Sequence, residues 1–133
     1  METNKINCIL LVDDDNITNY INQRLLKKLQ LSDNIVTANN GDEALKFIQQ
    51  FSSENNNCGP ELIFMDVNMP GMKGFDFLDE FNKIEISNRD KIRIVVVSAS
   101  SDGPDKGKTE MLELPYLTKP LTIDAIKEVL ELV

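Results

Sequence analysis

The chain has 133 residues, a length that favours one domain with a single hydrophobic core. Its hydrophobic fraction of 41% and charged fraction of 27% are ordinary for a globular protein, and no stretch is long and apolar enough to predict a membrane span. The net charge of -8 argues against nucleic-acid binding by this domain, because an acidic surface repels phosphate backbones.

The residue types narrow the chemistry further. The chain has no histidine, which excludes histidine metal ligands and catalysis by Ser-His or Cys-His pairs. Its two cysteines, Cys8 and Cys58, are expected to be free thiols, one in an apolar stretch and one in a polar stretch. The apolar run near the N-terminus is short and ends in acidic residues, unlike a signal peptide. We therefore expect a cytoplasmic protein without membrane contact.

The first half of the chain alternates between strand and helix patterns. Residues 6–12 form a short, continuous apolar run that is typical of a buried strand. From Asn16 onward a four-residue period predicts an amphipathic helix. The apolar side of this helix carries Ile17, Ile21, Leu25 and Leu29. Residues 34–38 predict a second strand, and a second helix follows the turn at Asn40-Gly41. The expected inner face of that helix consists of Ala44, Leu45, Ile48 and Phe51.

The second half continues the alternation after a polar loop at 52–60. The expected elements are strands at 61–65, within 91–100 and at 115–119, and helices at 75–84 and 120–133, the last with Thr122 as a possible N-cap. The segment 101–114 is rich in glycine and proline at its start, which predicts only a short helix over about 108–114.

Five strand-helix repeats predict an α/β domain spanning residues 1–133. The spacing is typical of a doubly wound parallel sheet covered by helices on both faces. We expect the (βα)5, flavodoxin-like strand order 2-1-3-4-5, in which strands one and three are neighbours at the point where the order reverses. Ligands bind to such sheets outside the carboxyl ends of the strands.

Polar residues follow the strands at this edge. Asp13 and Asp14 end the first strand, Asp66 ends the third, Ser98 ends the fourth and Lys119 ends the fifth. The predicted order therefore brings three carboxylates, a hydroxyl and an ammonium into one crevice. Clustered carboxylates repel one another unless a cation joins them, and Mg²⁺ binds carboxylate oxygens together with phosphate. This set suits phosphoryl transfer, with Asp66 as the candidate nucleophile for an aspartyl phosphate.

The same stretches resemble the receiver domains of two-component response regulators. The resemblance is carried by "LLVDDD", "TANNGDEAL", "LIFMDVNMPGMKG", "VVVSAS" and "YLTKP", which occur in order over almost the whole chain. Each stretch alone is a weak signal, whereas all five in order at compatible spacing are highly specific.

The resemblance implies a role for each residue of the pocket. Asp66 would accept a phosphoryl group from a histidine kinase phosphohistidine and also bind Mg²⁺. Asp14 would bind Mg²⁺ directly, Asp13 mainly through water, and Asn68 through its backbone carbonyl. Lys119 would contact the phosphoryl group.

The resemblance also implies a switch and an output. Ser98 would hydrogen-bond the phosphoryl group and move toward it, and Tyr116 would turn inward when Ser98 moves. The Lys119-Pro120 peptide bond would be cis. The protein would be a regulator rather than an enzyme, assisting its own phosphorylation and dephosphorylation, and would act as a monomer or weak dimer. Its partners would be a histidine kinase or phosphotransfer protein and an output protein, which meets the face of strand four, helix four and strand five.

Two other functions compete with this interpretation. A Mg²⁺-dependent phosphatase that forms an aspartyl phosphate would need a second acid two residues after the nucleophile, where the chain has Asn68. A degenerate receiver would be a scaffold that is never phosphorylated, although all five site residues are present. The simplest alternative is that the acids are solvated side chains at strand ends, as surface carboxylates commonly are.

Overall fold

The computed structural model describes residues 6, 8–51, 61–67, 74–83, 92–98 and 114–132. These ranges hold β1 (Ile9–Val12), α1 (Asn16–Lys28), β2 (Ile35–Ala38), α2 (Gly41–Phe51), β3 (Leu62–Asp66), α3 (Gly74–Lys83), β4 (Arg93–Ser98), β5 (Tyr116–Thr118) and α5 (Ile123–Leu132). The loop expected at 52–60 and the short helix expected over about 108–114 fall mainly outside the described residues. The other predicted elements are present, with small shifts at their ends.

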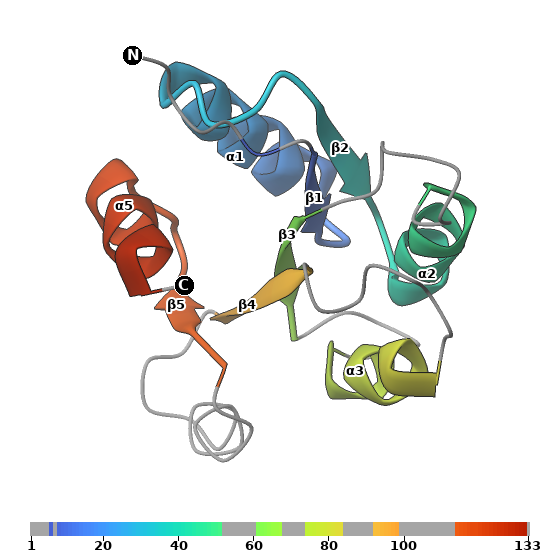
Figure 1. Cartoon of the computed structure of the whole chain (residues 1–133). Helices are drawn as coiled ribbons and strands as arrows, with labels where there is room; N and C mark the ends of the chain where they lie inside the picture. The colour runs from blue at the N-terminus through green and yellow to red at the C-terminus, as the bar shows by residue number, and fades with distance from the viewer. Residues whose placement is uncertain are drawn as a thin grey trace.

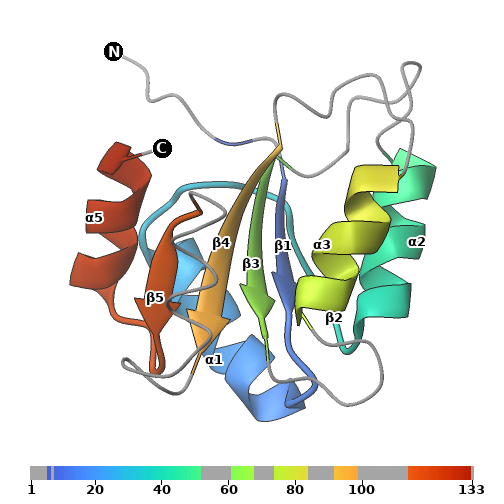
Figure 2. The same cartoon turned by 90° about the horizontal axis from the view of Figure 1, so that it is seen from below.

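The strands form one sheet in the order β2-β1-β3-β4-β5, and every pairing is parallel. This confirms the predicted doubly wound, flavodoxin-like arrangement. The order reverses between β1 and β3, where Val12 lies opposite Met65. Because both strands run in the same direction, the residues that follow them meet at one edge of the sheet (Figure 2).

Helices cover both faces of the sheet, α1 and α5 on one side and α2 and α3 on the other (Figure 1). Successive residues of a strand point to opposite faces, so each central strand contributes to two cores. Leu10 and Ile63 pack in the core under α2 and α3, whereas Leu11 and Phe64 pack in the core under α1 and α5. Burial on both faces explains why β1 and β3 are continuously apolar.

The predicted inner face of α1 was wrong in its first half. Ile17 and Ile21 are 69% and 52% exposed, and the buried residues of this helix are Asn19, Asn22 and Leu26. The first turn of α1 extends beyond the ends of the strands, where it has no apolar sheet to cover (Figure 2). The four-residue period therefore identified the helix but not the side that it buries at its start.

Other local predictions agree with the structure. Ala44 and Ile48 of α2 are buried, whereas the side chain of Phe51 is not among those described. Thr122 caps α5, because its hydroxyl oxygen accepts a hydrogen bond from the Ala125 amide at 3.1 Å. The Lys119-Pro120 peptide bond is cis. In the described ranges, no helix combines the length and apolar character that crossing a membrane requires.

Candidate metal centre

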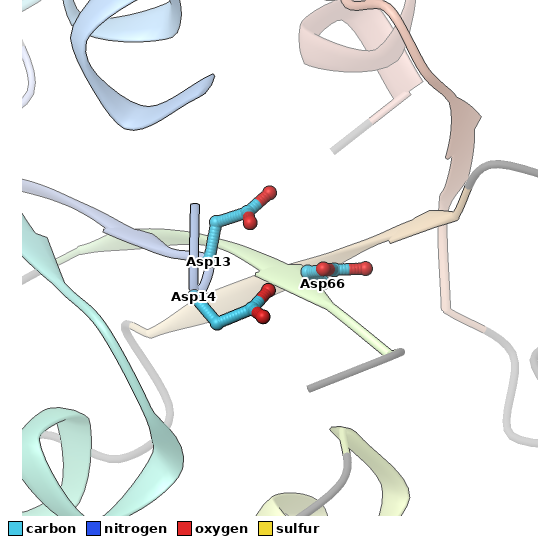
Figure 3. A group of neighbouring side chains, drawn as sticks. All are labelled: Asp13, Asp14 and Asp66. Atoms are coloured by element: carbon cyan, nitrogen blue, oxygen red, sulfur yellow. The ribbon is translucent and has the colours of Figure 1, made fainter. Parts of the chain in front are cut away.

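Three carboxyl groups lie together at the switch point of the sheet. Asp13 and Asp14 directly follow β1, and Asp66 is the last residue of β3. One oxygen from each of the three carboxyl groups lies within 4.8 Å of the others (Figure 3). Asp13 and Asp66 are buried, whereas Asp14 is exposed. The cluster is therefore open to solvent on the side of Asp14 and closed beneath.

Lys119 supplies a positive charge to the two buried carboxylates. Its Nζ lies 2.7 Å from Asp13 Oδ2 and 3.1 Å from Asp66 Oδ2. Burial alone would lower the pKa of Lys119, but the hydrogen bond to Asp13 and the charge of Asp66 raise it above the usual 10.5. The raised pKa means that the charged Lys119 stabilises the folded state fully at a pH below 10.5. This stabilisation is lost only as the pH rises through the raised pKa. At neutral pH the ammonium therefore stays charged between its partners.

Asp13 is held by contacts on its backbone and on its side chain. Its Oδ1 accepts a hydrogen bond from the Asp15 amide at 2.9 Å, and its own amide donates to the Ala38 carbonyl at 3.1 Å. The Asp13 carbonyl accepts a hydrogen bond from Asn19 Nδ2 at 2.9 Å. With the Lys119 contact, these bonds fix the carboxylate in one orientation.

Asp15, the third acid of the run, is the N-cap of α1. Its carboxylate accepts hydrogen bonds from the Thr18 hydroxyl at 2.7 Å and from the Ile17 amide at 3.1 Å. The Thr18 contact first, and then the Ile17 contact, lower the pKa of Asp15 below 3.8. The stabilisation of α1 by this cap is thus present at a pH above 3.8 and is lost as the pH falls through the lowered pKa of Asp15. The three consecutive acids therefore serve different purposes, and Asp15 stands outside the cluster.

The remaining predicted residues lie at or near the same edge. Ser98 is fully buried at the end of β4, and its carbonyl accepts a hydrogen bond from the Lys119 amide at 2.7 Å. Tyr116 of β5 is partly buried and packs against the core on the side of α2 and α3. Asn68 lies outside the described residues, so its role as a carbonyl ligand stays a prediction. The roles of Ser98 and Tyr116 also stay predictions.

The donor set fits a hard divalent cation. Three carboxylates and one ammonium leave an excess of two negative charges, which one divalent ion would balance. Mg²⁺ prefers oxygen ligands and keeps several waters, and the exposed side of the cluster gives room for them. Asp14 is the carboxylate most accessible to such an ion, since it is exposed while Asp13 and Asp66 already contact Lys119.

Sequence reasoning missed Asn19 and Asn22 beside this cluster. Both are buried on α1, and both line a small cavity that Asp13 and Asp66 also line. Their spacing with Leu26, three and then four residues apart, is that of one helix face. That spacing was the available signal, but a search restricted to apolar residues passes over it.

Comparison with known proteins identifies a family. The family model described as "Response regulator receiver domain" matches residues 9–131. A probable C4-dicarboxylate response regulator, DctR of Bacillus subtilis, is 27% identical over 126 residues, which are 92% of this chain and 50% of that protein. The response regulator Rcp1 of Synechocystis is 31% identical over 119 residues, which are 89% of this chain and 80% of that protein. The chain thus spans only half the length of the first relative.

Solved structures agree with these matches. A two-component response regulator from Cytophaga hutchinsonii superposes with a TM-score of 0.85 at 28% identity, covering 96% of each chain. The receiver domain of the histidine kinase CKI1 from Arabidopsis thaliana, solved in complex with Mg²⁺ and BeF3⁻, gives a TM-score of 0.77 at 25% identity. That match covers 93% of this chain and 89% of the other. Because the family model spans nearly the whole sequence and the fold agrees, this chain belongs to the response regulator receiver domains.

Proposed function

We propose that this receiver domain, spanning residues 1–133, is a switch controlled by phosphorylation of Asp66. The observation that carries the proposal is the position of Asp66 at the end of a central strand, beside Asp13, Asp14 and Lys119. The donor is the phosphohistidine of a histidine kinase or phosphotransfer protein. The domain acts as a regulator that assists its own phosphorylation and dephosphorylation, rather than as an enzyme with a separate substrate.

The transfer step uses one oxygen of Asp66 as the nucleophile. That oxygen forms a bond to phosphorus while the bond between phosphorus and the imidazole nitrogen of the donor breaks. Lys119 Nζ, which pairs with Asp66 Oδ2 at 3.1 Å, then contacts a phosphoryl oxygen. Asp14 would hold Mg²⁺ directly and Asp13 mainly through water, with Asp66 and the Asn68 carbonyl as further ligands, and the ion would neutralise negative charge on the phosphoryl oxygens.

The response to the phosphoryl charge involves Ser98 at the end of β4 and Tyr116 of β5. The Ser98 hydroxyl donates a hydrogen bond to a phosphoryl oxygen and moves toward it. That movement leaves room for Tyr116. The Tyr116 side chain is half-buried in the structure and turns further inward after the movement. Val96 and Ser98 of β4 lie opposite Tyr116 and Thr118 of β5, so a shift at Ser98 is transmitted directly to the neighbouring strand. The changed face of β4 and β5 would alter affinity for an output protein; helix four of the predicted output face lies mainly outside the described residues.

Phosphoryl uptake from a small donor tests this function. Incubation with acetyl phosphate and Mg²⁺ should add one phosphoryl group to the intact chain, as measured by mass spectrometry. Chelation of Mg²⁺ should reduce the uptake rate strongly, because the carboxylates alone repel the incoming phosphoryl oxygens. Absence of uptake in every condition would contradict the proposal and favour a scaffold that is never phosphorylated. Release of phosphate from many small phosphomonoesters would favour a phosphatase instead.

Exposed apolar residues beside the pocket suggest where a protein donor makes contact. Ile17, Tyr20 and Ile21 of α1 are the exposed large apolar residues among those described. Ile21 also lines a cavity of about 290 Å³ together with Lys119 and Pro120. A donor whose histidine reaches Asp66 must cover this rim, and burial of the apolar side chains would strengthen the complex.

Ile21→Ala should therefore separate a protein donor from a small one. We expect transfer from a histidine kinase that phosphorylates the unchanged chain to slow by about tenfold, equivalent to about 1.4 kcal/mol. Uptake from acetyl phosphate should not change, since the substitution leaves Asp66 and its neighbours in place. Lys28→Ala, at the far end of the same helix, is the matched control. Equal slowing with both donors would show damage to the pocket and contradict the docking role.

A further inference from the structure

Helix α1 places two polar side chains in the interior directly beneath the acidic cluster. Asn19 is 3% exposed and Asn22 is 8% exposed, although exposed positions are available on the same helix. Burying an amide is costly unless its polar atoms are hydrogen-bonded. The first half of α1 nevertheless buries these two residues and exposes Ile17 and Ile21. The contacts of Asn19 give a physical reason for this arrangement.

The Asn19 amide group joins three elements at the metal centre. Its Nδ2 donates to the Asp13 carbonyl at 2.9 Å and lies 3.5 Å from the Ala38 carbonyl. Asp13 directly follows β1, Ala38 is the last residue of β2, and Asn19 itself belongs to α1. The Asp13 carbonyl is part of the peptide unit that leads to Asp14. A hydrogen bond to that carbonyl therefore orients the backbone between the two carboxylates that follow β1.

The oxygen of the same amide is buried, and Asn19 lines a small cavity. Asn19 Oδ1 is buried and has no hydrogen-bond partner among the described residues. The cavity that Asn19 lines measures about 10 Å³, and Asp13, Asn22 and Asp66 line it as well. Carboxylate oxygens and Oδ1 are all acceptors, so a molecule that bridges them must donate two hydrogen bonds. Water meets this requirement, and the cavity is at the lower limit of the roughly 10–15 Å³ that one water needs.

We propose that Asn19 is a positioning residue for the metal centre and that it acts from two sides of its amide. Nδ2 holds the Asp13-Asp14 peptide through the Asp13 carbonyl. Oδ1 holds one buried water, which donates its second hydrogen to a carboxylate oxygen of Asp13 or Asp66. Asn19 thereby sets the geometry of the carboxylate ligands without itself binding the metal ion.

This role rests on the proposed Mg²⁺ site and makes a prediction about affinity. Residues that orient metal ligands typically change metal affinity by 10- to 100-fold when they are replaced. Asn19→Leu keeps the number and branching of the side-chain heavy atoms but removes both the donor and the acceptor. We expect it to raise the Mg²⁺ dissociation constant, measured by isothermal titration calorimetry, by about tenfold or more. Leu26→Val, about two helical turns further along the buried side of α1, should lower the thermal midpoint and leave the dissociation constant unchanged.

The pair of variants separates positioning from stability. If Asn19→Leu is less stable but binds Mg²⁺ as tightly as the unchanged chain, Asn19 is only structural and the inference is wrong. If Asn19→Leu does not fold, Asn19→Ser replaces it, because the smaller side chain cannot overfill the cavity and cannot reach both carbonyls. If the unchanged chain binds no Mg²⁺, the proposed metal site fails, which is a different result from equal binding by parent and variant.

The buried water has its own test. A high-resolution crystal structure of the unchanged chain should show a water within hydrogen-bond distance of Asn19 Oδ1 and of a carboxylate oxygen. The same position should be empty or filled by the side chain in Asn19→Leu. A dry cavity in the unchanged chain would overturn the second half of the proposal.

Discussion

Asp66→Asn should abolish phosphoryl uptake from acetyl phosphate while leaving the chain folded. The substitution keeps the size of the side chain but replaces a carboxylate oxygen by an amide nitrogen, and a carboxamide is a very poor nucleophile. The ion pair between Lys119 and Asp13 at 2.7 Å remains, so the ammonium is not left without a partner. Intact-protein mass spectrometry should show no mass gain under conditions that phosphorylate the unchanged chain fully.

Asp124→Asn is the matched control for this experiment. Asp124 lies in the first turn of α5, is exposed and is not part of the acidic cluster. The Asp124→Asn variant should be phosphorylated as fast as the unchanged chain. This result would show that removing one acidic charge does not by itself abolish phosphoryl uptake. A full mass gain in Asp66→Asn would place the phosphoacceptor at another residue, and the function proposed for the cluster would have to be given up.

Lys119→Met should lower stability when Mg²⁺ is absent and lower it much less when Mg²⁺ is saturating. The ammonium is the charge that pairs with Asp13 and Asp66, both buried, and its loss leaves two carboxylates facing each other. Breaking a fully buried pair costs about 3–5 kcal/mol. Because the Lys119 side chain is 24% exposed, we expect about 2–3 kcal/mol from denaturant unfolding in a chelating buffer.

The same variant should bind Mg²⁺ more tightly than the unchanged chain. The ammonium and the metal ion are both attracted by the negative charges of Asp13 and Asp66, and they repel each other. Removing the ammonium therefore strengthens the attraction between the carboxylates and the metal ion. Bound metal stabilises the folded state in proportion to its affinity, which restores most of the lost free energy. Phosphoryl uptake should still be slow, since Lys119 no longer contacts the phosphoryl oxygens.

Lys83→Met provides the comparison for that experiment. Lys83 pairs with Glu80 at 3.4 Å on α3, and its side chain is 72% exposed. Exposed pairs of this kind contribute about 0–1 kcal/mol, so its loss should barely change unfolding with or without Mg²⁺. If Lys119→Met were equally mild in chelating buffer, the ion pairs beneath the cluster would not contribute to folding.

The sheet and the acidic cluster were predictable because both follow from the order of elements. Five apolar runs separated by helical patterns permit few parallel arrangements, and in the expected one the ends of β1 and β3 coincide. Asp13, Asp14 and Asp66 are thus brought together by topology alone. The caps at Asp15 and Thr122 are local features, set within a few residues, which is why α1 and α5 begin close to their expected starts.

The buried side of α1 could not be predicted in the same way. A hydrophobic period says which residues share a side of the helix, but not which turns of the helix lie over the sheet. The partners of Asn19 are the carbonyls of Asp13 and Ala38, and Ala38 is nineteen residues away in the chain. Contacts with backbone carbonyls add no pattern of side-chain types beyond the helical spacing that Asn19 and Asn22 share with Leu26. For that reason an inward-facing asparagine reads as an ordinary polar residue.

The lysine between the two buried carboxylates also bears on how the protein is made. A small domain whose acidic ligands have no counter-ion of their own completes folding only when its metal arrives, as many structural metal domains do. Here Lys119 is part of the same polypeptide and reaches Asp13 and Asp66 as soon as β5 joins the sheet. Because these charges pair without a divalent ion, we expect newly synthesised chains to fold even where magnesium is absent.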